Sequence, residues 1–181
     1  MANKCIHLSP GPEADTIGSM NTRPVPTVVS VNISPGGIPK RPLDEVMVTE
    51  RGLTGDGHNH DKHNTPIQAV SVIDVEDLDE LRTEGFNVSP GATGENLTDR
   101  GLDVDALAVG DQLHFSGGLE LVLTKVRHPC YVLDAIDPQL KGAIVGRCGY
   151  LAKVAKPAIV RPGESITVVH AGAAIEHAVV T

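Results

Sequence analysis

Short apolar runs rich in β-branched residues alternate with turn-forming residues along most of the chain. Val, Ile and Thr favour strands, while Gly, Pro, Asn and Asp favour the turns between them. Seven runs have the length and content of strands: residues 27–33, 45–49, 67–73, 112–115, 119–126, 150–155 and 165–169. The pattern therefore predicts a structure made mostly of short strands.

One segment carries a clear helical period. Val75, Leu78 and Leu81 recur at a spacing that places them on one helix face, and acidic residues fill the first turn, where the helix dipole favours them. Asp74 is a candidate N-cap. A second, shorter helix is expected at residues 138–145. Strands with a few short helices predict a mostly β (α+β) fold, a barrel or a sandwich.

The length of 181 residues suits a single domain. Residues 1–26 contain several prolines and few apolar residues, so we expect a flexible N-terminal arm. We expect the folded domain to cover residues 27–170 and residues 171–181 to form a flexible tail.

Composition narrows the range of functions. The net charge of −8 gives the chain no overall electrostatic reason to bind nucleic acid. No apolar run reaches the roughly 20 residues needed to span a bilayer, and the N-terminus lacks the apolar core of a signal peptide. Three cysteines without CxxC spacing argue for reduced thiols. We therefore expect a cytoplasmic protein.

The most polar stretch of the chain is a His-rich loop. It contains Asp56, His58, His60 and His63, and glycines flank Asp56 on both sides. These residue types ligate zinc or iron, and a Gly-flanked loop can fold around an ion. The same loop could line a ligand pocket, or it could be a solvated loop in which Asp56 caps a turn. The residues alone do not decide between these three interpretations of the loop.

Two further stretches carry candidate chemistry. In residues 90–97 glycines allow close backbone approach, and Glu95 and Asn96 could hydrogen-bond a heterocycle. In residues 125–130 a strand ends in Lys125, Arg127 and His128 before Pro129 turns the chain at Cys130. A thiol near cations ionises more readily, and the thiolate attacks sulfur or binds soft metals. Cys130 is thus better placed than Cys5 or Cys148.

Seven short motifs occur in the order seen in MOSC domains, which are named for the C-terminal domain of molybdenum cofactor sulfurase. They are Gly36-Gly37-Ile38-Pro39-Lys40, Gly52-Leu53-Thr54-Gly55-Asp56-Gly57-His58, Gln68-Ala69-Val70-Ser71, Pro90-Gly91 with Gly94-Glu95-Asn96-Leu97, Gly101-Leu102-Asp103, Gly110-Asp111, and Arg127 with Pro129-Cys130. The chain resembles a stand-alone member of this family over about residues 28–169.

The resemblance implies a MOSC-like β-barrel and a pocket for the molybdenum cofactor (molybdopterin). The family's cysteine falls on Cys130, which would carry sulfur or ligate molybdenum. Lys125, Arg127 and Arg147 become candidates for the pterin phosphate. His58, Glu95 and Asn96 would line the same pocket. The histidines at 60 and 63 go beyond the family's usual pattern.

Three functions follow as hypotheses. In the first, the protein handles the molybdenum cofactor: it either reduces N-hydroxylated substrates with electrons from a partner, or carries sulfur on Cys130 from a separate cysteine desulfurase. We see no aminotransferase-like part that would supply the sulfur by a pyridoxal-phosphate route. In the second, a zinc or iron ion on the Asp56, His58, His60 and His63 loop serves a lyase or hydrolase. In the third, the domain only binds a small anion.

Overall fold

The computed structural model describes residues 24–57 and 65–172. The predicted N-terminal arm up to residue 23, the tail from residue 173, and His58, His60 and His63 lie outside the described residues. No helix in the two described stretches is long and apolar enough to cross a membrane.

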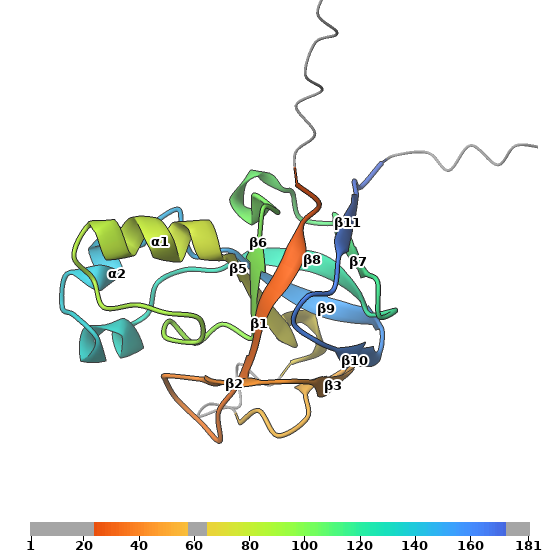
Figure 1. The fold of residues 1–181 in the computed structure, drawn as a ribbon, viewed down its shortest axis with the longest axis horizontal. Helices are drawn as coiled ribbons and strands as arrows, with labels where there is room; N and C mark the ends of the chain where they lie inside the picture. The colour runs from red at the N-terminus through yellow and green to blue at the C-terminus, as the bar shows by residue number, and fades with distance from the viewer. Residues whose placement is uncertain (1–23, 58–64, 173–181) are drawn as a thin grey trace, which may run out of the picture.

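Two sheets form the framework (Figure 1). The large sheet contains, in chain order, β1 (Thr27–Ile33), β2 (Arg41–Leu43), β5 (Val70–Asp74), β6 (Leu97–Arg100), β7 (Gln112–Phe115), β8 (Glu120–Val126), β9 (Tyr150–Lys156) and β11 (Ile166–Val169). Its strand order in space is β11-β7-β8-β9-β5-β6-β1-β2. The small sheet has the order β10-β3-β4, made of β10 (Ala158–Val160), β3 (Val46–Thr49) and β4 (Gly52–Leu53).

The large sheet is antiparallel except at one pair. β5 and β6 run parallel, and the helix α1 (Val75–Thr83) lies in the connection between them. The far ends of the sheet approach each other, because Thr27 and Ser165 form an isolated bridge and the Val28 N–H donates to the Glu164 carbonyl at 2.9 Å. The sheet therefore curves toward a barrel without closing into a continuous ladder, and the mostly β prediction is confirmed.

The chain buries two hydrophobic clusters. The larger lies between the sheets, with Val31, Val72 and Leu121 from the large sheet and Val48 from the small one. The smaller lies between β5 and the helices, where α1 and α2 (Leu140–Ala143) sit together on one side of the sheet (Figure 1). Residues along β5 face alternate clusters, so this strand is buried on both sides.

Three short helical turns complete the described fold. They are η2 (Pro66–Gln68), η3 (Val104–Ala106) and η4 (Tyr131–Ala135). The expected strand at residues 67–73 therefore starts only at Val70, because the residues after Pro66 form a helical turn. Asp74 does occupy the N-cap position of α1, but its carboxylate caps no helix N–H and accepts the backbone N–H of Val104.

Candidate functional site

Cys130 follows the end of β8 in an extended segment. The Arg127 N–H donates to the Gly149 carbonyl at 2.9 Å, which holds the start of this segment against the chain before β9. Cys130 itself precedes η4 with an extended backbone, and its free thiol is exposed. The predicted outward position of Cys130 is therefore what the structure shows.

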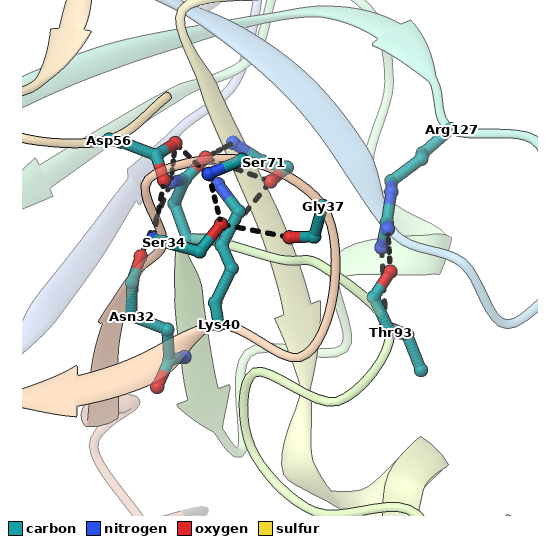
Figure 2. Close-up of polar contacts among 10 residues, drawn as sticks. Asn32, Ser34, Gly37, Lys40, Asp56, Ser71, Thr93 and Arg127 are labelled. Atoms are coloured by element: carbon teal, nitrogen blue, oxygen red, sulfur yellow. Dashed lines mark hydrogen bonds and ion pairs between the residues drawn. The ribbon is translucent and has the colours of Figure 1, made fainter. Parts of the chain in front are cut away.

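Arg127 ties this segment to the loop before β6. Its guanidinium donates to the Thr93 carbonyl and, at 3.4 Å, to the Thr93 hydroxyl (Figure 2). The loop also approaches Ile38: at Gly94, where φ is +90°, a Cβ would lie 2.9 Å from the Ile38 side chain. Glycine is needed there both for the backbone conformation and for the close contact.

A small hollow lies beside Cys130. It has a volume of about 30 Å³ and is lined by Thr93, Arg127, His128, Pro129, Cys130, Leu133, Ile144 and Cys148. A space of this size holds about one water molecule. Burial raises the pKa of the Cys148 thiol to about 11, so this second cysteine stays protonated and unreactive. Cys130 is thus the accessible thiol of the two.

A second polar cluster surrounds Asp56. Its carboxylate is almost fully buried and pairs with the ammonium group of Lys40. It also accepts the Ser34 N–H at 2.9 Å and an Asn96 amide N–H at 2.8 Å (Figure 2). Within the described residues, the bonds of the Asp56 carboxylate thus connect three segments of the chain around it.

The charges of both Asp56 and Arg127 act on Lys40. Burial lowers its pKa, Asp56 opposes that shift, and the charge of Arg127 lowers the pKa further. A lysine that feels both Asp56 and Arg127 links the clusters electrostatically. The sequence motif around Gly36-Gly37 contains Lys40, but sequence reasoning assigned it no role, because its partner lies sixteen residues away.

Glu95 and Asn96 are buried in the interior. Glu95 accepts the Gly91 N–H and the hydroxyls of Thr93 and Thr98, so both of its oxygens are used. Asn96 connects β5 to the Asp56 cluster, since its oxygen accepts the Ser71 hydroxyl at 3.0 Å. The hydrogen bonds of Glu95 fix the conformation of the loop at residues 90–97, to which Arg127 is bonded through Thr93. Direct contact of either side chain with a cofactor stays a prediction.

Lys125 and Arg147 do not line the hollow beside Cys130. Lys125 is exposed on β8. Arg147 points to α1, where its guanidinium bonds Glu84 at 2.7 and 3.0 Å and also meets Glu80. Within the described ranges no group of three His, Cys, Asp or Glu side chains is placed to hold a metal ion. The candidate site therefore consists of Cys130, Arg127 and His128. Arg127 connects it to the loop at residues 90–97 through Thr93.

Comparisons with known proteins agree with this fold. A protein named "Reductase" from Gibberella moniliformis is 25% identical over 178 residues, covering 84% of this chain but only 31% of that protein. The YiiM structure from Geobacillus stearothermophilus has a TM-score of 0.66 at 25% identity, covering 82% of this chain and 77% of that one. The YUAD protein from Bacillus subtilis, at 19% identity, has a TM-score of 0.67 and covers 80% and 96% of the two chains.

The family comparison accounts for the arrangement as a whole. Residues 59–167, more than half of the chain, match the model of the MOSC domain. The matched part includes the loop at 90–97, the end of β8 and Cys130, which are the elements that the structure brings together. The chain belongs to the MOSC domain family.

Proposed function

We propose that the protein handles the molybdenum cofactor, with Cys130 as the thiol that ligates molybdenum or carries sulfur. The observation that supports this most is the exposed Cys130 thiol beside Arg127 and His128. A thiolate suits soft metal ions and sulfur chemistry. Cationic donors suit the phosphate of a pterin cofactor.

The residue types around Cys130 suit the molybdenum cofactor, but the hollow beside Cys130 does not have room for it. The hollow of about 30 Å³ is far too small for a pterin. The cofactor would therefore need the open surface around Cys130 and the exposed His128, with Lys125, which is exposed on β8, as a further cation. In this proposal Arg127 and Lys125 bind the phosphate, while the Thr93 contact keeps Arg127 in position.

The cofactor, when bound, supplies two-electron redox chemistry at molybdenum. The chain's own residues then bind and orient it: Cys130 as thiolate and Arg127 as anion donor. The relative named "Reductase" supports the reductive form, in which a partner supplies electrons for an N-hydroxylated substrate. Because this chain spans only 31% of that relative, the partner and the substrate are proposals.

The experiment is purification without tags from a host that makes the cofactor, followed by metal analysis and pterin fluorescence. We expect molybdenum and pterin in the wild type and neither in Cys130→Ser. The same substitution at Cys5, which lies outside the matched motifs, should keep both. Zinc or iron in place of molybdenum, or no bound group at all, would contradict the proposal.

A second readout separates the two forms of the proposal. Incubation with a cysteine desulfurase and cysteine should add the mass of one sulfur atom to Cys130 if the protein carries sulfur. Mass spectrometry of the Cys130 peptide, with Cys130→Ser as the control, detects that addition. Cofactor binding without sulfur addition would exclude the sulfur-carrying form and favour the reductive form of the proposal.

A further inference from the structure

An acidic pocket lies where α1 begins. It has a volume of about 330 Å³ and is lined by Pro24, Asp74, Glu76, Asp77, Glu80, Gly101, Asp103 and Asp105. The carboxylates come from three parts of the fold: the end of β5, one face of α1, and the turn before and within η3. The pocket shares no lining residue with the hollow beside Cys130.

A buried carboxyl without a hydrogen-bond partner in the described residues lies on the strand beside Asp74. Asp99 on β6 is fully buried, and neither of its oxygens has a hydrogen-bond partner among the described residues. Asp99 pairs in register with Asp74, so the two side chains point to the same face of the sheet. Asp74 lines the pocket, so Asp99 lies next to a lining residue, and the charges of Asp74 and Glu76 both act on it.

The pocket-lining carboxylates are also incompletely satisfied. One oxygen of Asp74 and one of Asp105 are buried without a partner in the described structure. Buried polar groups in proteins are nearly always hydrogen-bonded, so three such carboxyls in one place require an explanation. Arg147, which is bonded to Glu84 and Glu80, is the cation that meets this cluster, and its charge acts on Asp77.

We propose that this pocket binds a small aliphatic di- or polyamine. A cation offsets the clustered negative charge, and the volume suits a short organic chain. The carboxylates surround the space and do not converge: in residues 24–57 and 65–172 no three of them are placed as a metal ion requires. Ammonium groups spaced along a chain donate several hydrogen bonds each, which matches carboxylates spaced around a pocket.

Isothermal titration of the full chain with spermidine and putrescine tests the proposal, with 1,4-butanediol as the uncharged probe. We expect saturable binding of both amines and none of the diol. The double variant Asp77→Asn/Glu80→Gln should weaken amine binding roughly tenfold. Asp77 and Glu80 both line the pocket, Asp77 in a hydrogen bond with Asp105 and Glu80 in an ion pair with Arg147. The amide replacements keep the shape of both side chains, and circular dichroism checks that the variant stays folded.

The matched control is Asp44→Asn/Glu50→Gln, which removes the same charge from exposed positions elsewhere. It should bind the amines like the wild type. An equal loss of binding in both double variants would show diffuse attraction to a chain of net charge −8 and would overturn the proposal. So would the absence of saturable amine binding, or binding of Mg²⁺ in its place.

Discussion

The buried pair of Lys40 and Asp56 joins the loop before β2 to the loop after β4. Both side chains are nearly inaccessible, at 11% and 2% exposed. Asp56 in turn holds Ser34 and Asn96, so the pair sits at the centre of the cluster in Figure 2. Removing one member of such a pair leaves a buried charge without compensation.

Lys40→Met should destabilise the protein by about 3 kcal/mol, because the Asp56 carboxylate stays buried and unpaired. The double variant Lys40→Met/Asp56→Asn should recover part of that loss, since it also removes the charge. Urea unfolding followed by circular dichroism measures both. A Lys40→Met protein as stable as the wild type would show that the pair contributes nothing to the cluster.

At the scale of elements, Gly149 connects the two regions that the proposals concern. Its carbonyl accepts the Arg127 N–H before Cys130, and its N–H donates to Asp105 of the acidic pocket at 3.2 Å. It has φ of +70°, and a Cβ there would lie 1.9 Å from the Val72 carbonyl oxygen. β5 and the chain before β9 can approach this closely only with glycine in place.

Gly149→Ala should therefore unfold the protein or lower its stability well beyond the about 1–2 kcal/mol of a left-handed conformation alone. Gly85→Ala is the matched control, because Gly85 has φ of +102° with no atom within 4 Å of an added Cβ. The difference between the two unfolding free energies measures the clash with β5. Equal losses in both variants would contradict this account of the close approach.

The sequence predicts the elements with strong local signals. β1 and β7 have the predicted bounds, and α1 contains Val75, Leu78 and Leu81 on one buried face, as predicted. The strands that sequence reasoning missed have weak patterns: β2 contains Pro42 and is fully exposed, and β4 has two residues. These strands depend on partners distant in the sequence.

The candidate site was predictable only in part, for the same reason. Local residue types place Cys130 at an exposed turn beside Arg127, and the structure agrees. The bonding of Glu95 with Thr98, of Asn96 with Ser71, and of Arg147 with Glu84 depends on tertiary contacts. No local pattern indicates which distant partner each of these side chains has.

At the scale of the whole molecule, carboxyl groups are concentrated around the start of α1. Burial, together with neighbouring carboxylates, raises the pKa of Asp74 to about 6 and that of Asp77 to about 7. Burial raises the pKa of Asp99 well above its usual value, with Asp74 and Glu76 adding to the effect. The folded protein thus holds protons near neutral pH that the unfolded chain has released.

The stability that these carboxyls contribute should therefore be highest below the unfolded-state pKa near 4 and decrease as pH rises through the folded-state pKa values of Asp74 and Asp77, about 6 and about 7. Asp77 is faced by Asp105 from η3, Asp74 from β5, Glu80 from its own helix and Arg147. Asp77→Asn should flatten this dependence. Urea unfolding at several pH values measures it, and a stability that rises toward pH 8 would contradict the uncompensated burial of these carboxyls.

At low pH the dependence is reversed, and stability should decrease as pH falls. Hydrogen bonds from Ala171, Ala108 and His170 lower the pKa of Asp111, and Arg147 lowers that of Glu84. The stability that these two groups contribute is complete above the unfolded-state pKa and is lost as pH falls through the folded-state value. The most stable pH should thus lie between these two pH ranges, on the acid side of neutrality.

Titration of the apoprotein with isolated molybdenum cofactor tests the central claim most directly. Wild type and Cys5→Ser should take up cofactor to the same stoichiometry, measured as molybdenum per chain after desalting. Cys130→Ser should retain none while keeping its circular dichroism spectrum, because Cys130 is exposed and the substitution exchanges one side-chain atom. Equal retention by Cys130→Ser would show that Cys130 is not the residue on which the cofactor chemistry depends.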